Sequence, residues 1–374
     1  MRTTGHYKVR GNIEHFIPDS LPPHSPPFTL NEEIMALYGD AMLHLGKLNE
    51  MANSLPGVQR FIKACIIKEA LLSSAIEGIH ATLLDIYTQT ILEEKPNKNT
   101  QLVMNYTAAI ESALNLMQKD GLANFSSVIL ASHKTLMTLE TDDKADPGNY
   151  RKYPVRVGAL IPAPADMVPG LMNDLAAYIN NADEVPALIK AGMAHVQFET
   201  IHPFLDGNGR IGRLLIVLML IEGDLLSTPI LYPSYYFKKY QMDYYHHLDA
   251  VRTLGDFEGW MLFYLTAIRD SSIDAYKRAK DIQALQEKIT QKIIDNSIKA
   301  PATKLRALSL LFVHPVMSIG MLSTELDITY NTAAQIMTDF LAIGFLEETG
   351  GVKRGKLFKF ADYLNLLDRS YDRG

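Results

Sequence analysis

A polar segment, His202–Arg213, lies between two apolar helical runs and limits how this chain can fold. The run Leu188–Ile201 precedes it and the run Leu214–Ile221 follows it. Because both runs are apolar, we expect two buried helices joined by a loop that opens the second helix at its amino terminus. Such a terminus presents unpaired backbone N–H groups and the positive end of the helix dipole. The segment therefore predicts an anion site within a helical core.

The glycines and arginines of this segment favour a phosphate as the anion. Gly207 and Gly209 let the backbone approach a phosphate without a clash from a Cβ atom. Arg210 and Arg213 are three residues apart, so they share one face of the second helix. Two guanidinium groups there can hold phosphate oxygens in paired hydrogen bonds. We therefore expect a phosphorylated ligand.

Two further side chains of the segment indicate a reaction. Asp206 is an unfavourable neighbour for a phosphate unless a hard cation bridges them, and Mg²⁺ held by one carboxylate, phosphates and water fits. His202 begins the loop and titrates near neutral pH, so it can take a proton from an attacking hydroxyl. His133 and His195, on other expected helices, are predicted to be hydrogen-bonded core residues, because no metal-ligand spacing accompanies them.

The segment matches H-P-F-x-D/E-G-N-G-R-x-x-R at every fixed position, and this pattern resembles the signature of the Fic (Fido) family. Most members transfer AMP from ATP to a Tyr, Thr or Ser hydroxyl of a protein. The resemblance implies that His202 is the general base and Asp206 the Mg²⁺ ligand. It also implies nucleotide contacts from the whole loop, namely Asp206, Gly207, Asn208, Gly209, Arg210, Ile211, Gly212 and Arg213. The alternative is a buried histidine beside a glycine turn and two surface arginines.

A second motif lies far upstream, where S-S-A-I-E-G resembles the inhibitory pattern S/T-x-x-x-E-G/N of the same family. Ser73 and Glu77 are four residues apart on one face of a helix expected at about 58–78, and Gly78 suits its carboxyl-terminal cap. The resemblance implies that Glu77 pairs with Arg213 and occupies the place of the γ-phosphate, which misaligns ATP for in-line attack. The alternative is an ordinary helix end with a solvated Glu77.

Two further regions are similar to nucleotide-binding regions of the family. The stretch 142–170 places glycines and prolines around an alternating Val-Arg-Val, which predicts a short strand and a small β-hairpin flap. The resemblance implies that this flap docks the target segment by main-chain pairing and borders the nucleotide with Val155, Arg156, Val157 and Gly158. It also implies an adenine pocket lined by Tyr244, Tyr245 and Arg252. A plain surface hairpin and core aromatic residues are the respective alternatives.

Composition fits a globular protein of two or three domains. Of the 374 residues, 47% are hydrophobic and 21% charged, and the net charge of −6 argues against a protein that coats nucleic acid or an acidic membrane. The single cysteine, Cys65, excludes an internal disulfide and suits a reducing compartment. The longest apolar run, Leu214–Ile221, is far too short to span a bilayer. We therefore expect a cytoplasmic protein with no membrane contact.

The expected fold is mostly α, with a helical core of the Fic type, a small β-hairpin flap and a C-terminal winged helix-turn-helix domain. Clustered prolines predict an extended N-terminal arm, and a charged amphipathic stretch predicts a connector helix. Three short helical patterns followed by two strands around a basic, glycine-bearing tip outline the winged helix. The expected organisation is an arm over 1–30, a helical region over 31–120, the catalytic core over 121–270, the connector over 271–300 and the winged helix over 301–374.

Alternatives remain open for the reaction and the partners. The same site can run in reverse and remove AMP from a modified protein, with Glu77 positioning a water, and related folds transfer UMP, phosphate or phosphocholine. The winged helix can bind DNA, but residues 301–374 balance eight Lys and Arg with eight Asp and Glu, so phosphate attraction is expected to be weak. Docking of a partner or pairing into a homodimer is the favoured use. ATP is the expected co-substrate, and the target is an unknown protein or the chain itself.

Overall fold

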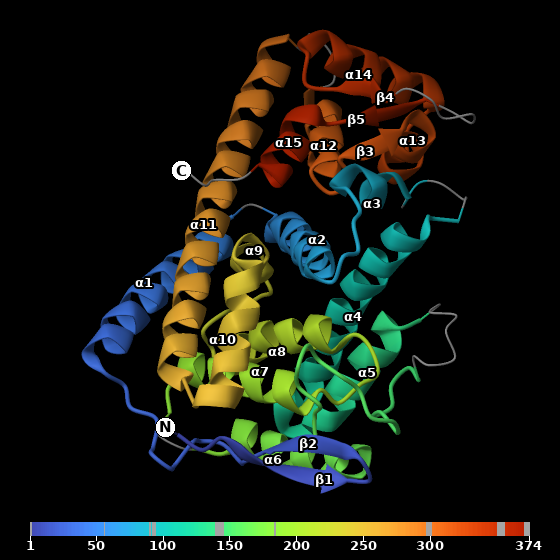
Figure 1. Cartoon of the computed structure of the whole chain (residues 1–374). Helices are drawn as coiled ribbons and strands as arrows, with labels where there is room; N and C mark the ends of the chain where they lie inside the picture. Colours follow the sequence, from blue (N-terminus) through green and yellow to red (C-terminus); the bar gives the residue numbers. More distant parts are fainter. Residues whose placement is uncertain are drawn as a thin grey trace.

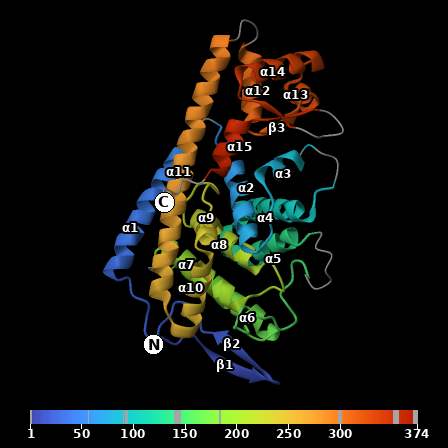
Figure 2. The same ribbon diagram turned by 45° about the horizontal axis from the view of Figure 1, so that its top comes forward.

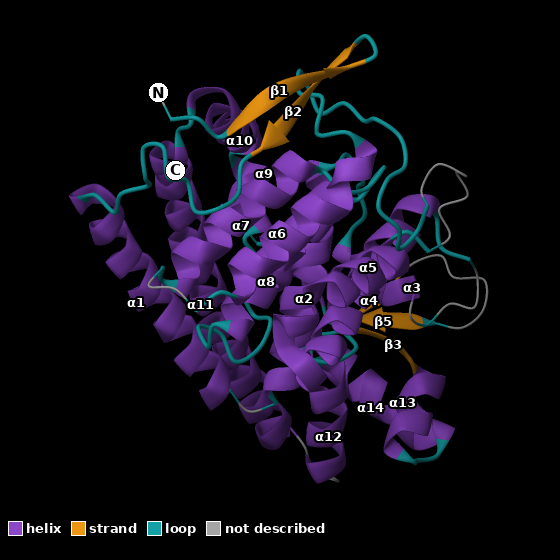
Figure 3. Cartoon of the chain, turned by 90° about the horizontal axis from the view of Figure 1, so that it is seen from below, coloured by secondary structure: helices purple, strands orange, loops and turns teal. Residues whose placement is uncertain are grey.

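The computed structural model describes residues 2–55, 57–89, 91, 95–138, 146–182, 185–296, 301–349 and 356–369. Helices dominate this part of the chain (Figures 1 and 3). The α-helices are α1 (Glu32–Ser54), α2 (Val58–Ile76), α3 (Leu83–Gln89), α4 (Lys98–Asp120), α5 (Phe125–Leu136), α6 (Val168–Asn180), α7 (Ala187–Ile201), α8 (Asn208–Glu222), α9 (Ser234–Lys239), α10 (Gln241–Leu254), α11 (Phe257–Asn296), α12 (Pro301–Leu311), α13 (Ile319–Leu326), α14 (Tyr330–Ile343) and α15 (Ala361–Asp368). The strands are β1 (Gly5–Arg10), β2 (Ile13–Pro18), β3 (Val316–Ser318), β4 (Glu347–Thr349) and β5 (Leu357–Lys359). None of the described helices combines the length and hydropathy that crossing a bilayer requires.

Helices α7 and α8 lie inside the helical core and carry the two apolar runs seen in the sequence. Every residue of α7 from Leu188 to Ile201 is buried, and α8 is buried over most of its length. Helices without an exposed polar stripe are stable only when other helices enclose them. Trp260 of α11 donates from Nε1 to Gly192 O of α7 at 2.9 Å, and a Cβ at Gly192 would lie 2.7 Å from the Tyr264 ring. The loop between α7 and α8 is therefore held by two tightly packed helices.

Helix α11 is longer than predicted. It runs without a break over Phe257–Asn296, so the connector helix expected over 271–300 continues a helix that begins within the expected core region. The sequence of this helix contains no proline, and nothing else interrupts its hydrogen-bond ladder. Ile282, Ile289 and Ile293 extend the buried face toward the C-terminal unit. The helix runs along one side of the molecule and lies beside α1 (Figures 1 and 2).

The N-terminal arm contains a β-hairpin that the sequence did not predict. Residues 5–10 of β1 pair antiparallel with residues 13–18 of β2, through a turn at Gly11 with a φ of 60°. Nearly all of β1 is exposed, so the inside–outside alternation that marks a strand is weak. β2 is anchored to the flap region, because Phe16 N donates to Ile161 O at 2.9 Å. The arm and the flap thus form one continuous surface.

The predicted flap is a tight turn rather than a two-stranded hairpin. Val157 and Leu160 form a β-bridge and exchange two backbone hydrogen bonds of 2.9 and 3.0 Å. Gly158 has a φ of 59°, which allows the chain to turn there. Pro154 and Pro162 have no N–H to offer a strand ladder, so the predicted strand shrinks to this single bridge.

The C-terminal unit contains the three predicted helices as α12, α13 and α14, and β3 joins the two predicted strands. The sheet is antiparallel in the order β3-β5-β4. The unit packs on the helical core, since Lys68 of α2 donates to Leu367 O at 2.9 Å and Arg278 of α11 donates to the same carbonyl at 2.9 Å. The basic tip predicted between the last two strands lies at 350–355, outside the described residues.

Candidate active site

The loop between α7 and α8 is held by hydrogen bonds within itself and to a neighbouring histidine. The Asn208 side chain accepts from Phe204 N at 2.8 Å and donates to Phe204 O at 2.9 Å. The Phe204 ring stacks on His133 with centroids 3.7 Å apart. His133 Nδ1 accepts from Gly148 N, so Nε2 carries the proton and donates to Asp206 O at 3.1 Å. Burial lowers the pKa of His133 to about 4, and its predicted role as a hydrogen-bonded core residue is confirmed.

Helix α8 begins at Asn208, within the polar segment. Gly207 precedes it with a φ of 80° and provides no side-chain cap. Because the helix start has no cap, its first N–H groups remain available to an anion. Gly209, in the first turn, lines the cavity beside this start.

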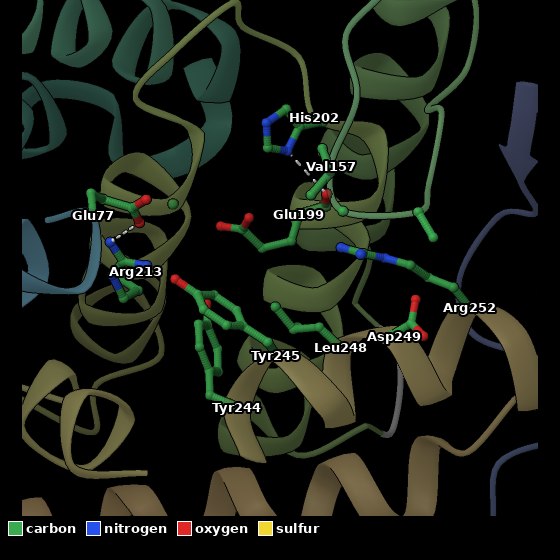
Figure 4. Close-up of a pocket in the computed structure, with 13 residues that line it drawn as sticks. Glu77, Val157, Glu199, His202, Arg213, Tyr244, Tyr245, Leu248, Asp249 and Arg252 are labelled. Atoms are coloured by element: carbon green, nitrogen blue, oxygen red, sulfur yellow. Dashed lines mark hydrogen bonds and ion pairs between the residues drawn. The ribbon is translucent and has the colours of Figure 1, made fainter. Parts of the chain in front are cut away.

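That cavity has a volume of about 470 Å³ and is bordered by α2, the flap, α7, α8 and α10 (Figure 4). Most of its lining residues were predicted from the sequence, and they come from segments far apart in the chain. The lining consists of Glu77, Val157, Gly158, Ala159, Glu199, His202, Gly209, Arg213, Tyr244, Tyr245, Leu248, Asp249 and Arg252.

Arg151 ties the flap to the end of α7. Its Nε donates to His202 O at 2.8 Å, and its Nη2 donates to Ala163 O at 2.6 Å and Ile201 O at 3.3 Å. The Arg151 side chain is buried, so these carbonyls supply hydrogen bonds that its guanidinium could not obtain from water. Arg151 therefore fixes where the flap stands relative to His202, a role that the sequence did not predict.

His202 ends α7 in the left-handed conformation, with a φ of 51°, and borders the cavity. Burial, aided by the positive charge of Arg252, lowers the pKa of His202 to about 3, so the ring is neutral near pH 7. Its Nδ1 lies 3.4 Å from Glu199 O, as Figure 4 shows. A carbonyl can only accept, so this contact favours a proton on Nδ1 and leaves Nε2 free to accept one.

Glu77 and Arg213 meet on one wall of the cavity (Figure 4). Arg213 Nη2 donates to Glu77 Oε1 at 2.7 Å, while Nε donates to Ser73 Oγ at 2.8 Å. Burial would raise the pKa of Glu77, but the charge and hydrogen bond of Arg213 lower it overall. Gly78, with a φ of 79°, follows directly as the predicted end of α2. The structure thus joins the two motifs that the sequence analysis singled out.

The remaining loop residues lie outside the cavity lining. The Asp206 side chain is 64% exposed and its Oδ1 lies 3.7 Å from Arg210 Nη2. The Arg210 Nε and Nη1 atoms are buried and have no hydrogen-bond partner among the described residues. Ile211 is fully buried in the core, because two residues of helix turn it away from Gly209. Its side chain does not line the cavity, and its expected contact with a nucleotide stays a prediction.

The flap reaches the cavity through only some of its predicted residues. Val157 and Gly158 line the cavity, whereas Val155 and Arg156 do not, and Arg156 is exposed. The tight turn at 157–160 explains why only Val157 and Gly158 line the cavity, because these two residues lie in the turn and the two before them do not.

Tyr244 lines the cavity and also contacts the buried core. It lines the cavity, and its hydroxyl lies 2.9 Å from His195 Nε2. His195 Nδ1 lies 2.8 Å from Gly212 O, a carbonyl that can only accept, so Nε2 accepts from Tyr244. This bears out the predicted core role of His195. Gly212 itself lies outside the cavity lining and packs against Glu199.

Sequence reasoning missed four lining residues, Ala159, Glu199, Leu248 and Asp249. Glu199 stands out because it is a buried carboxyl group, and burial raises its pKa to about 7. Its position three residues before His202 on one helix face could have identified it.

Asp206 is the residue suited to hold Mg²⁺. Its carboxylate is largely exposed at the loop beside Arg210, and a single carboxylate plus phosphates and water is a usual Mg²⁺ environment. Among the residues with assigned positions, no group of three or more His, Cys, Asp or Glu forms a metal cluster. A metal here would therefore depend on a phosphorylated ligand for its other contacts.

Comparison with known proteins identifies relatives for most of the helical core. Residues 124–220 match the model of the Fic/DOC family, and residues 35–115 match the model of the Fic/DOC family N-terminal region. A probable protein adenylyltransferase of Aquifex aeolicus is 39% identical over 84 residues, covering 22% of this chain and 26% of that protein. The protein adenylyltransferase Fic of Nematostella vectensis is 28% identical over 253 residues, covering 65% of this chain and 56% of that protein. The chain thus spans roughly a quarter to a half of these relatives.

A solved structure covers more of the chain. The crystal structure of a Fic family protein from Desulfovibrio desulfuricans G20 superposes with a TM-score of 0.57 and 25% identity, covering 90% of this chain and 98% of the other. The chain therefore shares its mostly helical fold with that Fic family protein.

Proposed function

We propose that this chain is a Fic/DOC family protein, that it transfers AMP from ATP to a hydroxyl group of a protein, and that Glu77 restrains this activity. The observation that carries the proposal is the 2.7 Å ion pair between Glu77 and Arg213, inside the cavity that His202 borders. An arginine next to a helix amino terminus suits a phosphate, and here the Glu77 carboxylate pairs with it.

The phosphates of ATP would lie along α8. Gly209 exposes backbone at the uncapped helix start, and Arg213 supplies a guanidinium one turn later. Asp206 would hold Mg²⁺, which supplies charge neutralisation to the phosphates when it is bound. The nucleoside half then lies toward Tyr245, Leu248 and the flap, where the cavity is lined by apolar and aromatic side chains.

His202 has the state that a general base needs. Its ring is neutral, and Nε2 is free to take a proton from the target hydroxyl. The hydroxyl oxygen forms a bond to the α-phosphorus, the bond from that phosphorus to the bridging oxygen breaks, and pyrophosphate leaves. An extended target segment would bind beside the flap, whose Val157 and Gly158 line the cavity.

The proposal is tested by incubating the wild-type protein, Glu77→Gly and Glu77→Gln with ATP, Mg²⁺ and a bacterial lysate, and measuring protein mass. We expect Glu77→Gly to add the mass of AMP to proteins far faster than the wild type, because Arg213 is released. Glu77→Gln keeps the shape but weakens the pair, so its rate should lie between the two. His202→Ala in the Glu77→Gly background should lower the rate by ~10²–10⁴-fold. If Glu77→Gly modified nothing, including itself, the proposal would fail.

A further inference from the structure

Glu199 places a buried carboxyl group on the cavity wall. The residue is 6% exposed, and its Oε1 has no hydrogen-bond partner among the residues that the structure describes. It lies on α7 one turn before His202, and in Figure 4 its carboxylate points into the cavity toward the side of Arg213. Burying an unpaired carboxylate is unfavourable, so its presence here calls for an explanation.

Two glycines of α8 make room for two carboxylates. A Cβ at Gly209 would overlap Glu77 Oε1, and a Cβ at Gly212 would overlap Glu199 Oε1. Since the two glycines are three residues apart, they share a helix face and are separated by ~4.5 Å along the axis. A phosphate that replaces Glu77 above Gly209 therefore lies within about one helix turn of Glu199.

The two carboxylates differ in their freedom to leave. Glu77 caps the end of α2, and its side chain is 35% exposed, so an incoming phosphate can displace it. Glu199 lies in the middle of the buried helix α7, so its backbone cannot move away as the end of a helix can. A phosphate and an ionised Glu199 at that spacing would repel strongly in a buried site. A proton on Glu199 removes the repulsion and creates a hydrogen-bond donor.

We propose that Glu199 takes up a proton when a nucleotide phosphate enters the cavity and, as a neutral acid, donates a hydrogen bond to the bound nucleotide. The inference deepens the proposed function, on whose nucleotide site it rests. It makes Glu199 a nucleotide-binding residue that works in its protonated form.

The surroundings of Glu199 already favour the neutral acid. Burial raises the pKa of Glu199 to about 7, against the lowering effect of Arg213 and with a further rise from Glu77. A phosphate carries more negative charge than the Glu77 carboxylate that it replaces, so it raises this pKa further. The flap residues lining the cavity carry no titratable group. The titratable and charged groups that border it are Glu77 on α2, His202 at the end of α7, Arg213 on α8, and Tyr244, Tyr245, Asp249 and Arg252 on α10.

Nucleotide affinity should therefore fall as the pH rises. Because Glu199 binds its proton more tightly in the complex than in the free protein, nucleotide affinity is highest below about pH 7 and falls up to tenfold per pH unit above it.

The test compares Glu77→Gly with Glu77→Gly/Glu199→Gln by calorimetry, using α,β-methylene-ATP with Mg²⁺, which cannot transfer AMP. Titrations at about pH 6 and about pH 8, each in two buffers of different ionisation enthalpy, count the protons taken up. Protons exchanged by the nucleotide itself are common to both proteins and cancel. At about pH 8 we expect Glu77→Gly to take up close to one more proton than the Gln variant and to bind at least about tenfold more weakly than it, with the two affinities converging as the pH falls toward 6.

A second variant separates the charge from the hydrogen bond and covers a failure of the first to fold. Glu77→Gly/Glu199→Met also lacks the charge, so its affinity should be as flat with pH as that of the Gln variant, but it should bind more weakly because Met cannot donate. Equal proton uptake by all three proteins, with parallel pH profiles, would overturn the role of Glu199 and leave the proposed function intact. If none of them bound the nucleotide, both proposals would fall.

Discussion

Glu77 and Arg213 are 136 residues apart in the chain and form a 2.7 Å ion pair. Ser73, on the same helix as Glu77, holds the other side of Arg213 through its hydroxyl at 2.8 Å and its carbonyl at 3.0 Å. The end of α2 therefore contacts the guanidinium through three acceptor oxygens. We infer that access to this guanidinium decides whether a triphosphate can bind.

A double-mutant cycle on this pair should show a measurable coupling. Arg213→Ala leaves Glu77 without its counter-ion, whereas in a Glu77→Gly background it leaves no such charge. The Glu77 side chain is partly exposed, so solvent screens the ion pair more than it would screen a fully buried one. We therefore expect a coupling of about 1–2 kcal/mol in the free energy of unfolding. Urea denaturation of the four proteins measures it. Additive effects of the two substitutions on the free energy of unfolding would mean that the ion pair does not contribute to stability.

The His133–Phe204 stack makes a separate prediction about acid stability. The folded pKa of His133, about 4, lies below its ordinary value, so the folded state binds fewer protons than the unfolded chain below about pH 6.5. The stability due to neutral His133 is complete above about pH 6.5 and is lost at about 1.4 kcal/mol per pH unit as the pH falls toward 4. The control is His133→Gln, because a glutamine side chain does not titrate. The gap in unfolding free energy between wild type and His133→Gln should narrow by about 2 kcal/mol from pH 7 to pH 5. A constant gap would contradict the assigned pKa.

Gly212 should be coupled to Glu199. A Cβ at position 212 would meet Glu199 Oε1, so Gly212→Ala must displace that carboxylate and should lower the unfolding free energy by about 1–3 kcal/mol. In a Glu199→Ala background the space is free, and the same substitution should have little effect. Thermal or urea unfolding of the four proteins tests this. An equal loss in both backgrounds would point to the Phe198 ring, which a Cβ would also approach at 3.1 Å.

The central part of the fold was predictable because its pattern is local. The apolar runs around residues 202–213 are helices α7 and α8, and the glycine after Glu77 ends α2 as expected. The pairing of Glu77 with Arg213 came from motif resemblance, since no local rule links residues so far apart in the chain.

The features that the sequence did not predict have physical causes. β1 is exposed on both faces, so its sequence lacks the alternation that marks a strand. The expected core and connector meet at residue 270 within the single helix α11, whose sequence contains no proline. Glu199 was not predicted to line the cavity, because charged residues are rarely buried and its burial depends on Gly212 of the neighbouring helix.

The identity of the transferred group tests the central claim most directly. Glu77→Gly, with Mg²⁺ and a lysate, is given ATP labelled at the α-phosphorus in one reaction and at the γ-phosphorus in another. We predict that the α-label becomes bound to protein and the γ-label does not, and that His202→Ala in the same background abolishes the α-signal. Labelling from the γ-phosphorus, or no labelling from either, would contradict AMP transfer by this cavity.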